Sequence, residues 1–434
     1  MSERSSQITA SQDAAPVYWK SPEMATRRKA RYRADRRLQF YGMAAIMFAL
    51  GFLALLISTL VFSGSRAFTQ TVATIEIDLS AANLDPGKLA DADWRKLSRD
   101  AYLALLPELD KSAEKDFFSI FTSNGKYLVR DAVIDDPRRL ANKSTFVIPL
   151  ADPLDQLAKG LFDRRLPEEQ RRVNDRQLGF FDQLVAKGLI IQQANWALIF
   201  NSDSRFPELA GLAGAIAGSF WLLVVCFSLC FPLGIAAAIY LEEFAPKNRW
   251  TDLIEINVNN LAAVPSVVFG LLGLAAFQGW LGLPRSVPLV GGMVLALMTL
   301  PTIIITTRVA LTQVPSAIRE AALGIGASKN EAIFHHMLPL AMPTILTGTI
   351  IGLARALGET APLLLIGMNA FITGSPAGIM DASTALPTQI YIWADSPERG
   401  FVSRTSAAIL VLLAFLITMN AIAVFLRQRF ERRW

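Results

Sequence analysis

Apolar residues in this chain are gathered in six long runs, each of about the 20 residues or more that a helix needs to cross the hydrocarbon core of a bilayer. The runs lie at residues 40–63, 209–241, 253–278, 286–307, 341–367 and 404–427. This pattern predicts an all-α polytopic membrane protein with six transmembrane helices.

The basic residues predict how these helices are oriented. Residues 1–39 are rich in Ser, Ala and Arg and indicate a disordered basic tail, with its arginines next to the first run. Arg308 and Arg319 lie between the fourth and fifth runs, and the end of the chain carries Arg427, Arg429, Arg432 and Arg433. Because short cytoplasmic segments carry the excess of Lys and Arg, both termini are expected in the cytoplasm. The run at 40–63 is too long for a signal-peptide core, so we interpret it as an uncleaved transmembrane anchor helix.

Residues 64–208 separate the first two runs and are mostly polar. Alternating residues at 74–79 predict a strand, and helical periodicity occurs near 93–107 and 176–188. The segment is long enough for a small extracytoplasmic α+β accessory domain. It contains no recognisable nucleophile motif, metal-ligand spacing or phosphate loop, and a structural or docking module is the default interpretation.

The composition limits the remaining function classes. Hydrophobic residues make up 52% of the 434 residues and charged residues only 18%, which argues against a cytosolic globular protein. The net charge of +5 resides beside apolar runs, so a membrane topology explains it better than nucleic-acid binding. Cys226 and Cys230 lie inside an apolar run and suit packing. No metal site is predicted, since adjacent His335 and His336 would point about 100° apart on a helix.

The connection between the fourth and fifth runs has the pattern of two short helices joined by a tight turn. Gly324 and Gly326 can end the first helix. Ser328, followed three residues later by Glu331, is a capping-box pattern for the second helix, and Pro339 marks its expected end. An amphipathic loop lying flat on the membrane is the alternative.

The fifth run carries two charges, Arg355 and Glu359, near its middle. An arginine at that depth costs about 2.5–3.5 kcal/mol on insertion scales, so lipid is an unfavourable surrounding for it. The spacing of four residues places both side chains on one helix face, pointing toward the bundle interior or a wet path. Pro362 then interrupts the helix. A purely structural ion pair between helices is the alternative to a role in transport.

The loop at 308–340 resembles the EAA loop of permease subunits in ABC importers. The resemblance rests on Glu320-Ala321-Ala322, Gly326 and Leu338-Pro339 at the family spacing, and His336 departs from it where an aliphatic residue is usual. It implies that the loop is a coupling helix that inserts into a groove of a separate ATP-hydrolysing subunit. The residues implied in this coupling are Glu320, Ala321, Ala322, Gly326 and Lys329.

Two further stretches resemble the phosphate permeases of that family. They are Val264-Pro265-Ser266-Val267-Val268-Phe269-Gly270 and Gly358-Glu359-Thr360-Ala361-Pro362, and the resemblance covers about residues 205–434. It implies a type I ABC importer permease fold over 209–434, with 64–208 as an insertion. The implied substrate pathway includes Arg355, Glu359, Thr360 and Ser266. A guanidinium offers paired donors to phosphate oxygens, which suits this role chemically.

The resemblance also implies partners, because the chain has no Walker phosphate loop of its own. No catalytic residue and no cofactor are expected in this chain. ATP and magnesium would be bound by a homodimeric ATPase subunit, with a second permease chain and a periplasmic phosphate-binding protein completing an importer in the bacterial inner membrane. A permease for sulfate, molybdate or phosphonate, an ion-coupled secondary transporter and a membrane sensor remain alternatives.

Overall fold

The computed structural model describes residues 22–80, 84, 89 and 92–430. The chain divides into two compact units, residues 1–59 and 60–434. The first unit is formed by helix α1 (Pro22–Ser65), which continues a short way into the second. The helix begins well before residue 40, so the prediction of disorder is wrong for residues 22–39; Arg, Lys and Ala there are good helix formers. Residues 1–21 of the predicted tail lie outside the described residues.

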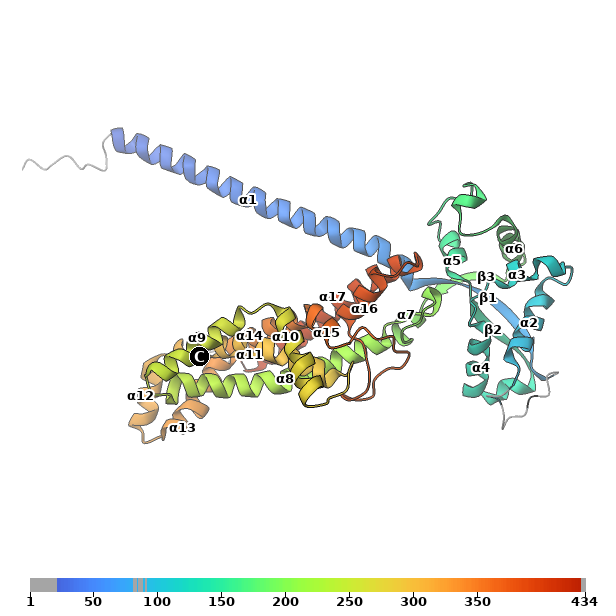
Figure 1. The fold of residues 1–434 in the computed structure, drawn as a ribbon. Helices are drawn as coiled ribbons and strands as arrows, with labels where there is room; N and C mark the ends of the chain where they lie inside the picture. Colours follow the sequence, from blue (N-terminus) through green and yellow to red (C-terminus); the bar gives the residue numbers. More distant parts are fainter. Residues whose placement is uncertain (1–21, 81–83, 85–88, 90–91, 431–434) are drawn as a thin grey trace, which may run out of the picture. The chain divides into compact units, whose positions relative to one another are not determined.

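An α+β domain follows α1, as expected for residues 64–208, and we call it the insertion domain (Figure 1). Its sheet has the order β2-β1-β3, and both pairs are antiparallel. Ile75 of β1 lies opposite Phe146 of β2, and Val72 lies opposite Ile191 of β3. The elements are β1 (Thr69–Asp78), α2 (Trp94–Leu105), α3 (Glu114–Phe118), α4 (Gly125–Asp135), β2 (Lys143–Pro149), α5 (Asp152–Ala158), α6 (Asp175–Ala186), β3 (Ile190–Ala194) and α7 (Ala197–Phe200).

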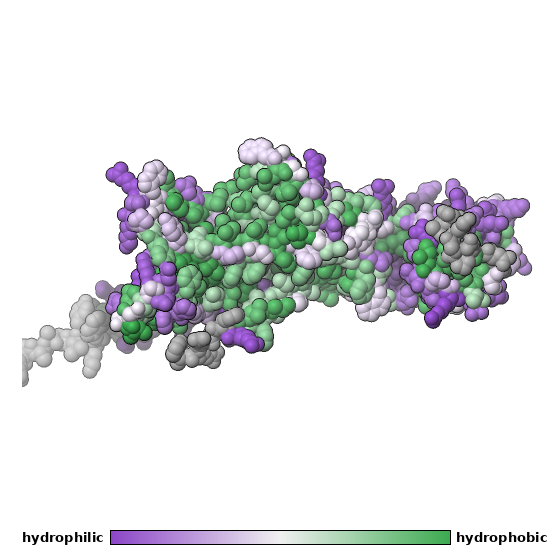
Figure 2. Space-filling model, turned by 90° about the horizontal axis from the view of Figure 1, so that it is seen from below, coloured by the Kyte–Doolittle hydropathy of each residue, from purple (hydrophilic) through white to green (hydrophobic). Residues whose placement is uncertain are grey.

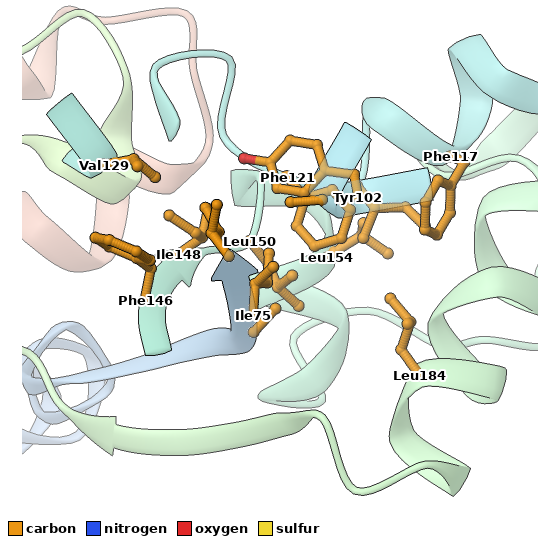
Figure 3. Close-up of a cluster of buried hydrophobic side chains, with 14 of the residues drawn as sticks. Ile75, Tyr102, Phe117, Phe121, Val129, Phe146, Ile148, Leu150, Leu154 and Leu184 are labelled. Carbon is orange, nitrogen blue, oxygen red and sulfur yellow. The ribbon is translucent and has the colours of Figure 1, made fainter. Parts of the chain in front are cut away.

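The insertion domain has a hydrophobic core of its own, which Figure 3 shows. Alternate residues of β1, among them Ile75, point into it beside Ile148 of β2, as the period-2 pattern requires. The rings of Tyr102 and Phe121 stack with centroids 4.4 Å apart. Burial raises the pKa of Tyr102 to about 12. This core is what allows 64–208 to fold as a domain rather than as a connecting loop.

The remainder of the chain is helical, and apolar side chains gather on its outside (Figure 2), as expected of a surface that faces lipid. The described residues hold five helices long and apolar enough to cross a membrane, or six when one bent pair counts as a single span. The elements are α8 (Ala213–Ile239), the π-helical turn η9 (Tyr240–Phe244), α9 (Arg249–Ala262), α10 (Ser266–Leu272), the π-helical segment η10 (Gly273–Trp280), α11 (Pro288–Thr312), α12 (Ser316–Gly324), α13 (Lys329–Glu331), the π-helical turn η11 (Ala332–Met337), α14 (Leu338–Gly358), α15 (Ala361–Leu365), α16 (Leu386–Ala394) and α17 (Gly400–Phe430).

Helices α8 and α11 run parallel, and this fixes how the bent pair must be counted. A side chain on Gly292 would collide with Val225, and one on Gly234 would collide with Ile303, so residue numbers rise together along the contact. The chain between the two helices therefore has to return to the end at which α8 began. The return is made by α9 and α10 with η10, which meet at 103°. The predicted third span at 253–278 is thus present as one broken crossing.

Helix α14 runs antiparallel to α11, with Gly348 against Thr306 and Gly352 against Thr299. Its neighbour α17 brings Arg427 to Thr347 of α14. The predicted fifth run at 341–367 is not one continuous helix: α14 ends at Gly358 and a separate short helix, α15, follows. Proline at position 362 lacks the N–H that a continuous helix would need there, which is the physical reason for the break.

Candidate functional site

The loop between α11 and α14 forms the two short helices that the sequence predicts. Pro315 precedes α12, and Gly326 takes a φ of 92° in the turn, a conformation that favours glycine. Ser328 and Glu331 form the predicted capping box, and these hydrogen bonds hold the pKa of Glu331 below its ordinary value. Figure 1 shows α12 and α13 together at the end of the helices where α8 and α11 finish.

Pro339 does not end the second helix, so that expectation is wrong. Helix α14 begins at Leu338 and continues through Pro339. The wider π-helical turn η11 immediately before it shifts the hydrogen-bond pattern and accommodates the proline. Residues from Lys329 to Gly358 consequently form a single rod of 30 residues.

A salt bridge and a hydrogen bond tie this loop to the end of α8. Arg319 of α12 pairs with the buried carboxylate of Glu243 in η9. Lys329 donates to the backbone carbonyl of Glu243, and its ammonium lies 4.8 Å from the centroid of the Phe244 ring. Lys329, one of the predicted coupling residues, thus contacts η9 while remaining exposed. The role of Glu243 was not predicted from the sequence, because its partner Arg319 is 76 positions away and the residues around Glu243 do not indicate this pairing.

The loop nevertheless leaves a group of apolar side chains uncovered. Ile325 is 83% exposed, Phe334 is 52% exposed and Leu323 is 45% exposed. Ala322, by contrast, is only 4% exposed, because its side of α12 packs inward. The predicted coupling residues Glu320, Ala321 and Gly326 are exposed, so of the EAA triplet only the first two residues reach the surface.

The predicted charge pair is present but weakly joined. Arg355 lies in the last turn of α14, and its Nε is 3.8 Å from Oε1 of Glu359, which caps the helix. The Arg355 side chain is 62% exposed and that of Glu359 is 24% exposed. The expectation that both charges sit in mid-helix is wrong, because the helix ends between them. The guanidinium keeps donors free on the open face of α14.

The two stretches that resemble phosphate permeases meet in space. Gly270 of α10 packs so closely on α15 that an added Cβ would lie 2.7 Å from Cα of Pro362. Ser266 begins α10 one turn before Gly270, and Thr360 directly precedes α15. Ser266 and Thr360 are both half-buried. The structure thus brings the segments that carry the predicted pathway residues Ser266 and Thr360 together, although they are about ninety positions apart in the sequence.

A groove of about 560 Å³ lies on the same side of α14 as Arg355. It is lined by residues of α11, α14 and α17, among them Thr306, Thr347 and Ile351. Thr347, Ile351 and Arg355 are spaced four residues apart and so share one helix face. At the other end of the groove Nη1 of Arg427 donates to Oγ1 of Thr347 at 3.2 Å. Arg427 was interpreted from the sequence only as a topology charge, and its place in the groove was not foreseen.

Several membrane-spanning helices, a helix–turn–helix loop with an uncovered apolar face, and a guanidinium on an open helix face are the features expected of the permease class of transport subunits. Residues 230–434 match the family model described as "Binding-protein-dependent transport system inner membrane component", and residues 25–168 match a domain of unknown function, DUF3333. The phosphate transport system permease protein PstA of Yersinia pestis is 33% identical over 235 residues, which cover 52% of this chain and 76% of that protein.

Other relatives agree with this result. PstA 1 of Mycobacterium tuberculosis strain H37Rv is 32% identical over 51% of this chain and 71% of its own length. The probable ABC transporter permease protein YqgI of Bacillus subtilis is 26% identical over 56% of this chain and 87% of its own. A MetNI methionine ABC transporter structure covers 51% of this chain and 95% of its own at 17% identity, with a TM-score of 0.38 that is too low to carry an argument. The chain belongs to the PstA-like family of ABC importer permeases.

Proposed function

We propose that this chain is a membrane-spanning permease subunit that moves inorganic phosphate inward in an ATP-driven importer. The proposal rests on the exposure of the Arg355 guanidinium on the open face of α14. Its Nε lies 3.8 Å from Oε1 of Glu359, which is too far for a hydrogen bond. Such a fork can offer two parallel N–H donors to phosphate oxygens. The relatives named as phosphate permeases support the choice of anion.

The weak pairing of the two charges suits transport better than storage of the anion. A bare guanidinium in a passage of low dielectric would hold phosphate tightly, whereas a nearby carboxylate repels the anion and competes for the same donors. Glu359 would therefore engage Arg355 when the passage is empty and speed release of the anion. Ser266 and Thr360, both half-buried in the same region, would supply hydroxyl contacts.

The groove below Arg355 gives the anion a continuing path. Arg355 and Arg427 bracket the face of α14 that carries Thr347 and Ile351, and a phosphate leaving one guanidinium would meet the next. The other side of such a passage would be formed by a second permease subunit, PstC-like, in a heterodimer. Movement between the two sides would follow rigid-body changes of the permease pair rather than covalent chemistry on the anion.

Energy would come from outside the chain. The exposed apolar residues of the coupling loop, Leu323, Ile325 and Phe334, form a surface for a homodimeric ATPase subunit that binds ATP and magnesium. This chain itself would hold no cofactor and catalyse no reaction. A periplasmic phosphate-binding protein would deliver the anion, and both termini would lie in the cytoplasm of a cell with this chain in its inner membrane.

The test is phosphate uptake by the reconstituted importer with Arg355→Gln. Loss of a hydrogen bond to a charged group costs about 1.5–3 kcal/mol, so uptake should fall roughly 10- to 150-fold. Arg138→Gln is the matched control, because Arg138 is an exposed arginine of the insertion domain and does not belong to the permease helices. Unchanged uptake by a correctly assembled Arg355→Gln importer would remove the transport role of this residue.

The same preparation separates the alternative functions. Phosphate uptake that requires ATP hydrolysis and is not inhibited by sulfate, molybdate or phosphonate supports a phosphate importer. Competition by one of these oxyanions at equal concentration would reassign the substrate. Uptake driven by an ion gradient without the ATPase subunit would indicate a secondary transporter instead.

A further inference from the structure

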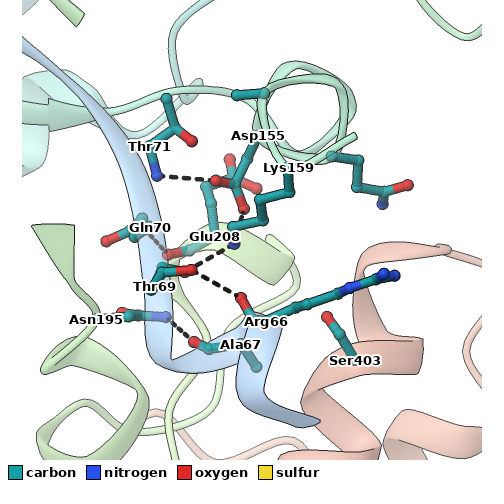
Figure 4. A network of polar contacts seen from close by, with 12 residues as sticks. Arg66, Ala67, Thr69, Gln70, Thr71, Asp155, Lys159, Asn195, Glu208 and Ser403 are labelled. Carbon is teal, nitrogen blue, oxygen red and sulfur yellow. Dashed lines mark hydrogen bonds and ion pairs between the residues drawn. The ribbon is translucent and has the colours of Figure 1, made fainter. Parts of the chain in front are cut away.

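A buried group of charges joins the insertion domain to the helices. It lies where β1 and α5 meet the short 3₁₀ helix η8 (Pro207–Leu209) and the first turn of α17 (Figure 4). The acids are Asp152, Asp155 and Glu208, and none of them is more than 9% exposed. The bases are Lys159, whose side chain is 9% exposed, and Arg404, which is 5% exposed. We call these five residues the junction cluster.

Three members of the cluster, Asp155, Lys159 and Arg404, form hydrogen bonds with backbone groups. Asp155 accepts from the N–H of Thr71 at 2.8 Å and pairs with Lys159 at 2.6 Å. Lys159 also donates to the carbonyl of Thr69 at 2.7 Å. Arg404, from α17, donates to the carbonyl of Ala210 at 2.6 Å. These contacts tie β1 to α5 and α17 to Ala210, and Gln70 of β1 donates to the backbone carbonyl of Glu208 in η8 at 2.5 Å, which joins the insertion domain to the segment before α8.

Asp152 contacts the permease helix most closely. Its Oδ1 would lie only 1.9 Å from a Cβ added to Gly400, the first residue of α17. On its own helix it accepts from the Gln156 amide at 2.6 Å. This close approach requires glycine at position 400. Any outward movement of the insertion domain therefore has to separate the Asp152 carboxylate from α17.

The cluster contains one more acid than base. The charged groups that act on Asp152 are Glu208 from η8, Asp155 from α5 and Arg404 from α17. Lys159 attracts it as well, but is itself paired with Asp155. When all five groups are ionised, one negative charge is uncompensated in a region shielded from water, which is costly. One added proton makes the cluster neutral.

We propose that the junction cluster is a proton-operated latch, in which one proton taken up at Asp152 tightens the attachment of the insertion domain to the outer end of α17. Burial, then the repulsion from Glu208 and Asp155, raises the pKa of Asp152 to about 6 from its ordinary 3.8. Burial also raises the pKa of Glu208. The closed junction therefore binds protons better than an opened, solvated one. By linkage the closed state gains stability as the pH falls through about 6, and loses it as the pH rises.

The experiment is hydrogen–deuterium exchange of the full chain in lipid nanodiscs at pH 7.5 and pH 5.0. Protection factors, corrected for intrinsic exchange at each pH, are followed in α5 and in the first turn of α17. One proton bound with a pKa of about 6 in the closed junction and 3.8 in the open one predicts about tenfold greater protection at pH 5.0. Equal protection at the two pH values would overturn the proposal.

Two variants separate a latch from a general effect of pH. Asp152→Asn imitates the protonated acid, so its junction should show the higher protection already at pH 7.5 and little further change. Gly400→Ala should lower protection about 5- to 150-fold at both pH values, because the added methyl pushes α5 from α17. Asp135→Asn, at an exposed acid of α4, is the control and should retain the pH response of the wild type.

The outcomes decide the proposal even when a variant fails to fold, since the wild-type response alone can refute it. A pH response that persists unchanged in Asp152→Asn would assign the proton to another group and overturn the role of Asp152. Phosphate uptake plays no part in the readout, so failure of the latch and failure of the proposed transport function are distinguishable.

Discussion

The side chain of Ile325 offers the sharpest test of the coupling loop. It is 83% exposed at the end of α12, next to Gly326 in its left-handed conformation. A large aliphatic side chain held rigidly in water by a glycine turn has no internal packing role to explain it. If the partner ATPase covers this residue, replacing it should weaken the complex without disturbing the permease fold.

The expected size of the effect follows from burial. Full burial of an isoleucine side chain contributes about 1.5–3 kcal/mol, which corresponds to roughly 10- to 150-fold in a dissociation constant. Ile325→Asp also places a charge in the interface, so the loss should reach at least the lower end of this range. Ile191→Asp is the matched control, because Ile191 is a 45% exposed isoleucine on β3 of the insertion domain.

The assay is binding of the purified ATPase subunit to the permease pair in nanodiscs, together with ATP hydrolysis by the assembled complex. We expect Ile325→Asp to weaken binding and uncouple hydrolysis from uptake, and Ile191→Asp to do neither. Binding of the ATPase to Ile325→Asp within twofold of the wild type would refute the assignment of this surface. Crosslinking from Ala321→Cys is a better complement than from Ala322, because Ala322 is buried.

Two further predictions concern stability and can be read from thermal unfolding of the full chain. Gly348→Ala should lower the melting temperature, because its Cβ would lie 2.6 Å from Cβ of Thr306 and overpacking costs about 1–3 kcal/mol. Gly358→Ala on the same helix is the control: its Cβ would meet no atom within 4 Å, so the melting temperature should not fall. Equal melting temperatures of these two variants would contradict the close α11–α14 packing. Tyr102→Phe should leave the melting temperature unchanged or raise it, since the buried hydroxyl has no hydrogen-bond partner among the described residues, and a clear drop would reveal one.

The sequence was informative where structure is decided locally. The capping box at Ser328 and Glu331 and the glycine turn at Gly326 depend on neighbours within a few residues, and both are present as predicted. The spans followed from the length of apolar runs, and the pairing of Arg355 with Glu359 from a spacing of four residues. Such features need no knowledge of distant parts of the chain.

The errors arose where distant contacts or unusual backbone geometry decide. The residues around Pro339 do not predict the π-helical turn η11, which allows the helix to continue through this proline. Lys329 is exposed, as a coupling residue would be, but its contact with the carbonyl of Glu243 could not be foreseen from the local pattern, because the two residues are 86 positions apart. Arg404 was not considered at all, since a lone arginine at the start of an apolar run is ordinary until α5 and η8 are seen to surround it.

The continuity of one helix gives the coupling loop a direct mechanical route to the candidate pathway. Lys329 to Gly358 form a single rod, so Arg355 lies about 39 Å along it from the loop at 1.5 Å per residue. Arg319 also ties the loop to Glu243 at the end of α8. In the proposed importer, a partner that pulls on Ile325 would therefore act on α14 and α8 together, while the small residues Gly348 and Gly352 keep α14 close against α11. The far end of this route is at Glu359, where the rod stops and the charge pair lies.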